Sequence, residues 1–200
     1  MAEEHYIGVD LGGTKILAGV FDSGHNCLFT DKNKTKAELG YEGVIARIVE
    51  TIRGAAHLTG IDVANCKGVG IGAPGTISAD GSTVLFAPNL DWRDVPLKAD
   101  LEAELGCPVW LGNDCSLAAM GIYRSEFESK PRDMVSIFLG TGIGAGIITN
   151  GAFLSGATQA AGEVGHMVLE PDGPVCGCGT KGCYEALASR TAIFNKVKAA

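Results

Sequence analysis

Four side chains that bind metals well lie close together near the end of the sequence. They are His166, Cys176, Cys178 and Cys183. One histidine with three cysteines is a common tetrahedral ligand set for zinc, and the glycines among them allow a loop tight enough for three sulfurs to converge. Four protein ligands leave no open position for an activated water, so the spacing predicts a structural zinc ion. The alternative is a set of free thiols near an unrelated histidine.

Two carboxylates flank this cluster, Glu163 ahead of it and Glu185 after it. A metal bound to the cluster would hold these carboxylates and His166 in one rigid wall. We therefore expect the zinc to organise a polar surface and to take no direct part in a reaction.

A glycine turn near the start of the chain could bind an anion. The apolar run 5–11 leads into 12–15 (Gly-Gly-Thr-Lys), and a second apolar run follows at 16–21, which predicts a tight hairpin. Exposed amides of such a turn form an anion-binding concavity, and Asp10 at the end of the first strand can hold a hydrated magnesium ion. An ordinary glycine hairpin is the alternative.

A second turn of this kind follows the buried strand 133–139. It comprises the glycine-rich stretch 140–146, and strand structure is expected to resume at Ile147. The spacing Gly140-x-Gly142-x-x-Ala145 fits the dinucleotide-binding fingerprint, which would indicate an NAD-dependent dehydrogenase. That fingerprint opens a helix, whereas this stretch continues into a strand. Two strand–turn–strand units instead suit a nucleotide held between two related lobes.

Asp114 lies where a strand is expected to end and a helix to begin. The strand 108–111 stops at Gly112-Asn113-Asp114, and a helix follows over 115–123. Ligands of open α/β sheets bind in crevices at such strand ends. The alternative is that Asp114 acts only as a helix N-cap.

The elements that position these residues alternate between strands and helices. Further strands are expected at 26–30, 67–71 and 83–86, and further helices at 41–58, 96–105 and 185–197. The fold class predicted is α/β, with a mixed sheet and flanking helices.

The amino-acid composition argues against several classes of function. The net charge of −7 over 200 residues argues against a nucleic-acid partner. No apolar run approaches the roughly 20 residues of a membrane span, and no secretory signal is expected at the start. Seven scattered or clustered cysteines suit a reducing cytoplasm with one metal site better than a disulfide framework.

Taken together, these motifs resemble the ROK family of sugar kinases and repressors, and within it the glucokinase-like kinases. The matching stretches are 10–15, 70–75, 112–114, 140–144, 162–166 and 176–185. The resemblance implies the actin-like, ribonuclease-H-like ATPase fold. It implies a small lobe over 1–112 and the start of a large lobe over 113–200, with the zinc loop at 166–183. Because members of the family are longer, it also implies that this chain is the N-terminal two-thirds of such a protein and that its second lobe is truncated.

The resemblance implies an ATP-dependent kinase acting on the 6-hydroxyl of glucose or a close hexose, with Asp114 as the catalytic base. The residues implied in sugar binding are Asn89, Asn113, Asp114, Glu163, His166 and Glu185. Those implied in binding ATP with Mg²⁺ are Asp10, Gly12, Gly13, Thr14, Lys15, Gly140, Thr141 and Gly142. The family also implies a homodimer or homotetramer. The alternative is a zinc-stabilised sugar-binding module without catalysis, or an inactive fragment of such a kinase.

Overall fold

The chain divides into two compact units, Met1–Asp114 and Cys115–Ala200, two residues away from the expected boundary between 112 and 113. This computed structural model describes residues 4–199. The first unit contains Asp10 and Asp114, and the second contains the four metal-ligand candidates.

A five-stranded mixed sheet forms the centre of the first unit, with the strand order β3-β2-β1-β4-β8. The strands are β1 (Tyr6–Leu11), β2 (Lys15–Phe21), β3 (Cys27–Lys34), β4 (Gly68–Ala73) and β8 (Val109–Asn113). β1 pairs antiparallel with β2, and β1, β4 and β8 run parallel. The carboxyl ends of these three strands therefore meet at one edge of the sheet, where ligands of open α/β sheets bind.

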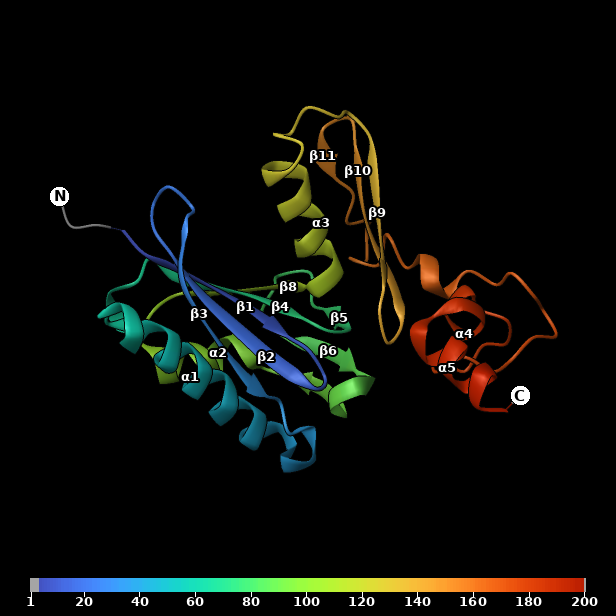
Figure 1. The fold of residues 1–200 in the computed structure, drawn as a ribbon, viewed down its shortest axis with the longest axis horizontal. Coiled ribbons are helices and arrows are strands. Elements are labelled where there is room, and N and C mark those ends of the chain that lie inside the picture. The colour runs from blue at the N-terminus through green and yellow to red at the C-terminus, as the bar shows by residue number, and fades with distance from the viewer. Residues whose placement is uncertain (1–3, 200) are drawn as a thin grey trace. The chain divides into compact units, whose positions relative to one another are not determined.

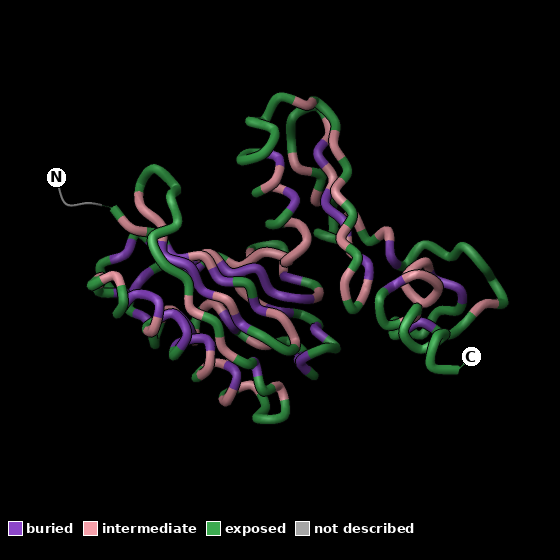
Figure 2. Tube along the Cα trace, in the orientation of Figure 1, coloured by how far each residue is buried: buried purple, intermediate pink, exposed green. Residues whose placement is uncertain are grey.

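One face of the sheet is covered by α1 (Gly40–Thr59), which contacts β2 and β3 (Figure 1). Val44, Ile48 and Ile52 recur at helical spacing and are buried against the strands. The shorter α2 (Leu97–Leu105) buries three leucines at the same spacing and packs beside β8. Purple segments in Figure 2 mark this core along the strands and the inner side of α1. The expected helices 41–58 and 96–105 are confirmed.

A small antiparallel sheet, β5-β6-β7, completes the first unit. Its strands are β5 (Thr76–Ile77), β6 (Val84–Ala87) and β7 (Trp92–Val95), and the short 3-10 helices are η1 (Ala37–Leu39), η2 (Val63–Asn65) and η3 (Pro88–Leu90). β7 was not expected, because its sequence WRDV has two charged residues at its centre and no clear apolar alternation.

The second unit contains an antiparallel sheet of β9 (Met134–Leu139), β10 (Ile143–Thr149) and β11 (Ala152–Phe153), together with all of α3 (Asp114–Ser125) except its first residue. The expectation that strand structure resumes only at Ile147 was wrong, since β10 begins at Ile143, which pairs with Leu139. The glycines inside β10 serve close packing. A Cβ atom at Gly144 would lie 2.4 Å from the Cys115 sulfur, and one at Gly146 would lie 2.2 Å from the Ala119 Cβ, so α3 rests directly on the strand.

The chain continues through η4 (Val164–His166), α4 (Tyr184–Ala188) and α5 (Arg190–Ala199). The single helix expected over 185–197 was wrong. Ser189 has extended backbone angles that interrupt the helix, and its hydroxyl accepts a hydrogen bond of 3.1 Å from the Ala192 amide at the start of α5. Among the described helices, none combines the length and apolar character needed to cross a bilayer.

Candidate functional site

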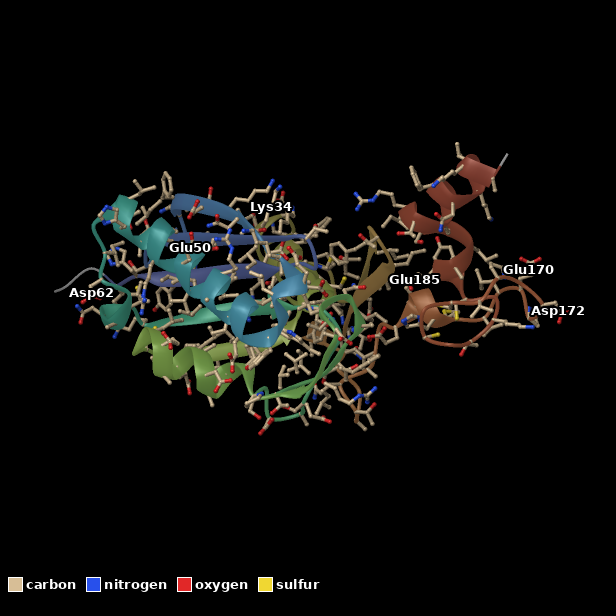
Figure 3. All side chains as sticks on the ribbon, turned by 90° about the horizontal axis from the view of Figure 1, so that it is seen from below. Lys34, Glu50, Asp62, Glu170, Asp172 and Glu185 are labelled. Atoms are coloured by element: carbon tan, nitrogen blue, oxygen red, sulfur yellow. The ribbon has the colours of Figure 1, made fainter. Side chains whose placement is uncertain are left out.

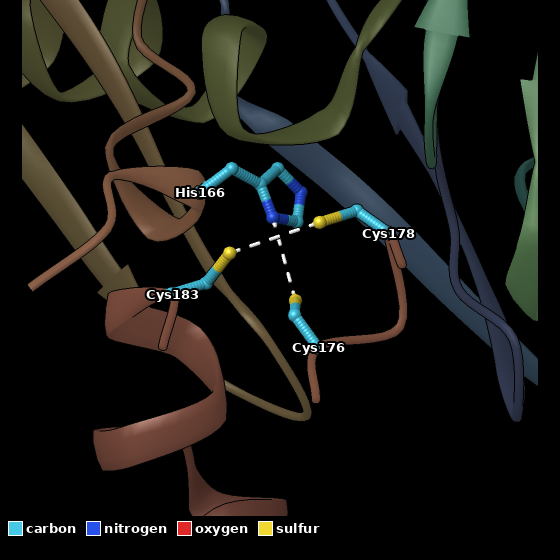
Figure 4. A group of neighbouring side chains, drawn as sticks. All are labelled: His166, Cys176, Cys178 and Cys183. Carbon is cyan, nitrogen blue, oxygen red and sulfur yellow. Dashed lines mark hydrogen bonds between the residues drawn. The ribbon is translucent and has the colours of Figure 1, made fainter. Parts of the chain in front are cut away.

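The four predicted metal ligands converge in the second unit (Figure 4). Their ligand atoms all lie within 4.8 Å of one another. His166 Nδ1 lies 3.6 Å from Cys176 Sγ, and the Sγ atoms of Cys178 and Cys183 are 3.7 Å apart. A tetrahedron with zinc–sulfur bonds of about 2.3 Å has edges of about 3.7 Å, so the spacing fits one zinc ion held by this set.

Hydrogen bonds within the loop place the sulfurs. The Cys176 amide donates to the Thr180 carbonyl at 2.8 Å, and the Gly179 amide donates to the Cys176 carbonyl at 2.9 Å. Gly182 has a φ of +71°, and a Cβ atom there would lie 1.5 Å from the Glu170 carbonyl oxygen. Only glycine fits this close crossing of the backbone, which brings Cys183 back to the other ligands.

The three thiols differ in acidity. Burial raises the pKa of Cys176 to about 12 and also raises the pKa of Cys183. The exposed Cys178 has its pKa lowered to about 7, chiefly because the Thr180 amide donates a hydrogen bond to its sulfur. Because zinc binds thiolates, metal binding to this set would displace protons from the sulfurs.

The two ring nitrogens of His166 face different groups. Nδ1 faces the sulfurs, and Nε2 lies 3.9 Å from Glu163 Oε2. The short helix η4 that carries His166 rests on β10, because a Cβ atom at the buried Gly165 would lie 2.1 Å from the Ile143 carbonyl oxygen. The ring can therefore bind a metal on one side while its other side lies beside an exposed carboxylate.

Glu185 lies between the cluster and the second glycine turn. Its Oε2 accepts a hydrogen bond of 2.9 Å from the Ile143 amide, and its Oε1 lies 3.7 Å from Cys176 Sγ. The turn at 140–142 is closed by a 2.9 Å hydrogen bond from the Gly140 amide to the Gly142 carbonyl. The strand–turn–strand arrangement predicted for this stretch is confirmed, with a turn shorter than expected.

In the first unit, Thr35 holds the turn at 12–15 from its buried side, a contact that the sequence did not predict. Thr35 is fully buried, its hydroxyl donates to the Gly12 carbonyl at 2.6 Å, and its amide donates to the Thr14 carbonyl at 3.1 Å. A threonine after a strand carries no local signal for such a long-range contact. Asp10 precedes this turn and is exposed.

Further predicted site residues lie at the same edge of the first unit. A Cβ atom at Gly13 would lie 3.3 Å from the Asn89 Cβ, which places Asn89 beside the turn. Asn113 donates from Nδ2 to the Gly75 carbonyl at 3.1 Å.

The register of the parallel strands brings Asp114, the candidate catalytic base, to this edge. Asp10 pairs with Gly72 across β1 and β4. A Cβ atom at Gly72 would lie 3.3 Å from the Cα of Asp114, which is half-buried. The first unit therefore gathers carboxylates, amide side chains and a glycine turn at one edge, and the second unit gathers two carboxylates, a glycine turn and the metal cluster.

Known proteins resemble this chain along nearly its whole length. The model of the ROK family matches residues 6–200. The glucokinase of Streptomyces coelicolor is 43% identical over 192 residues, covering 96% of this chain, and that of Thermotoga maritima is 42% identical over 188 residues, covering 94%. The crystal structure of a ROK family glucokinase from Streptomyces griseus, in complex with glucose and AMPPNP, superposes with a TM-score of 0.87 at 42% identity over 98% of this chain.

The chain is shorter than these relatives. It spans 58% of the length of each of the two glucokinases and 60% of the chain in the Streptomyces griseus structure. That structural similarity confirms the expected actin-like ATPase fold for the described part of the chain.

Proposed function

The chain belongs to the ROK family. We propose that it belongs to an ATP-dependent hexokinase that phosphorylates the 6-hydroxyl of glucose or a close hexose. The observation that carries this proposal is the convergence of the four metal ligands beside Glu163 and Glu185. A braced wall of carboxylates and an imidazole suits a polyol, whose many hydroxyl groups need paired acceptors and donors. The glucose and AMPPNP bound by the Streptomyces griseus relative support the same substrates.

Asp114 is the proposed catalytic base. Phosphoryl transfer passes through a loose transition state in which positioning and charge stabilisation dominate, and a carboxylate accepts the hydroxyl proton late. Asp114 directly follows β8 and is the first residue of α3, and this position at the carboxyl end of a strand supports the role.

The proposed sugar-binding residues are those that the family resemblance implies. Asn89, Asn113 and Asp114 belong to the first unit, and Glu163, His166 and Glu185 belong to the second. Both oxygens of Glu185 already have protein partners, but an ionised carboxylate has about four acceptor sites, so it can still accept a bond from a sugar hydroxyl.

The two glycine turns are the proposed phosphate sites. They comprise Gly12, Gly13, Thr14 and Lys15 in the first unit and Gly140, Thr141 and Gly142 in the second. Asp10 would orient a hydrated Mg²⁺, which neutralises phosphate charge when bound. Its exposure at the end of β1 leaves the carboxylate accessible for this purpose.

Zinc is proposed as a structural ion held by His166, Cys176, Cys178 and Cys183. His166 would bind it through Nδ1, while its Nε2 side stays with Glu163 and the sugar. We further propose that the two units correspond to the two lobes of the kinase, and that it works in the cytoplasm as a homo-oligomer without nucleic-acid or membrane partners.

The test is a coupled assay of ADP release with glucose, run on this chain and on any longer chain that contains it, together with calorimetric titration of glucose. Turnover that depends on glucose and MgATP supports the kinase. Glucose binding without ADP release in either chain would instead identify a non-catalytic sugar-binding module. Mannose, fructose and N-acetylglucosamine in the same assay identify the hexose.

A further inference from the structure

The second glycine turn is attached to the metal cluster through one side chain, Glu185. The carboxylate accepts the Ile143 amide hydrogen at 2.9 Å with Oε2, and it reaches Cys176 Sγ at 3.7 Å with Oε1. Ile143 is the first residue after the turn, and Cys176 is one of the four metal ligands. A half-buried carboxylate thus joins the two features directly.

The fit between the carboxylate and the turn is close. A Cβ atom at Gly142 would lie 2.2 Å from Glu185 Oε2 and 3.0 Å from its Cδ. The carboxylate therefore occupies the space that any larger residue at position 142 would fill, so this glycine is explained by packing against Glu185 as well as by the turn.

The start of α5 adds further attachments to the same turn. The Arg190 amide donates to the Gly140 carbonyl at 3.1 Å, and the Thr191 hydroxyl donates to the Thr141 carbonyl at 2.8 Å. Arg190 also donates from Nη2 to the Thr141 hydroxyl at 3.3 Å. Each residue of the turn therefore contacts the segment formed by α4 and α5.

Residues of the metal cluster lie at the start of that segment. Cys183 is the N-cap residue of α4, and the Tyr184 amide donates to the Met167 carbonyl at 2.9 Å, one residue after His166. A zinc ion bound to His166 and Cys183 would fix both neighbours of this hydrogen bond. The position of Glu185, two residues after Cys183, would then follow from occupation of the cluster.

We propose that Glu185 is a positioning residue that couples zinc binding to the conformation of the turn at 140–142. With zinc bound, the carboxylate holds the Ile143 amide and keeps the turn in its observed shape. When zinc is lost, α4 is released and the turn loosens. The consequence for phosphate binding rests on the function proposed above, whereas the coupling itself does not.

The test measures hydrogen–deuterium exchange of the Ile143 amide in this chain, by NMR or in peptides spanning 140–146. Zinc-loaded wild type is expected to protect this amide, and removal of zinc with a chelator is expected to speed its exchange by about tenfold or more. Glu185→Ala should exchange rapidly with or without zinc. Glu185→Gln keeps an acceptor oxygen and should restore part of the protection.

Glu170→Ala is the matched control. Figure 3 shows Glu170 and Asp172 at the outer edge of the metal-binding loop, away from Glu185, and the Glu170 side chain is exposed. This variant should match the wild type in zinc content and exchange. Zinc content is measured for every variant. If Glu185→Ala does not retain zinc, the Ile143 exchange rate of zinc-loaded Glu185→Gln decides the result, because it should show part of the wild-type protection.

Two outcomes would overturn the coupling. One is slow exchange of Ile143 in a zinc-loaded Glu185→Ala chain, and the other is unchanged exchange in the wild type after zinc removal. Neither outcome bears on whether the chain serves a kinase, and absence of sugar phosphorylation would leave the exchange result standing. The two proposals therefore fail separately.

Discussion

The hydroxyl of Thr35 donates a hydrogen bond of 2.6 Å to the carbonyl oxygen of Gly12, although the two residues lie on different segments of the first unit. This contact, together with the bond from the Thr35 amide to the Thr14 carbonyl, fixes the turn between β1 and β2 from its buried side. The exposed side of the turn remains accessible for an anion. The turn that we propose as a phosphate site is thus held on its buried side by Thr35.

Replacing Thr35 by Val should destabilise the first unit by about 1–2 kcal/mol, because it keeps the shape of the side chain but leaves the Gly12 carbonyl without its hydroxyl partner. Urea denaturation measures the effect. Thr35→Ser retains the hydroxyl and should recover most of the lost stability. Equal stability of wild type and Thr35→Val would show that the contact does not hold the turn.

Gly165→Ala should destabilise the second unit by about 1–3 kcal/mol, since the added methyl group would lie 2.1 Å from the Ile143 carbonyl oxygen. Gly121→Ala is the matched control. It lies on α3, where the added methyl group would have no atom within 4 Å apart from its chain neighbours and the nearby backbone of its own helix, and it should stabilise the chain by up to about 1 kcal/mol. Thermal denaturation compares the two. Similar shifts for both variants would contradict the close packing of η4 on β10.

The purified chain is expected to contain about one zinc ion, measured by atomic absorption. Chelation should lower its melting temperature, because a ligand that binds only the folded state stabilises it. Cys178→Ser should lose the metal, and Cys27→Ser should retain it, since Cys27 is exposed on β3 in the first unit. Equal zinc content in the two variants would argue against the proposed ligand set.

The buried thiol of Cys66 predicts a loss of stability in alkaline solution. Burial, with smaller contributions from Cys107 and Asp62, raises the pKa of Cys66 from the ordinary 9.0 to about 11. The folded chain keeps this proton at a pH where the unfolded chain releases it. The resulting stabilisation is therefore complete below pH 9.0 and is lost as the pH rises through about 11.

Melting temperatures of wild type and Cys66→Ala between about pH 8 and 11 measure this contribution. The wild type should lose stability more steeply than Cys66→Ala over the alkaline part of the range. Cys27→Ala, which removes an exposed thiol, should follow the wild-type slope. Parallel curves for wild type and Cys66→Ala would refute the assignment.

Local patterns predicted much of this structure. The apolar runs around residues 12–15 predicted the hairpin of β1 and β2, and helical periodicity predicted α1 with an error of one residue at each end. The convergence of His166 with three cysteines followed from ligand type and glycine spacing. These features have signals within a short window of sequence.

Features that depend on distant partners had no such signal. The glycines of β10 were interpreted as turn residues, because nothing local shows that Cys115 and Ala119 pack against them. The contacts of Thr35 and Thr191 with the glycine turns join residues far apart in the chain. The extended backbone of Ser189 ends α4, and its hydroxyl accepts a hydrogen bond from the Ala192 amide at the start of α5. The surrounding apolar pattern concealed that break.

The proposed phosphoryl-transfer step depends most directly on Asp114 as the catalytic base. ³¹P NMR of glucose with MgATP, using this chain and any longer chain that contains it, follows the formation of hexose 6-phosphate. We expect Asp114→Asn to slow product formation by about 10²–10⁴-fold while calorimetry shows nearly unchanged glucose affinity, because the amide cannot accept the hydroxyl proton. Phosphorylation by Asp114→Asn at a near-normal rate would contradict the account.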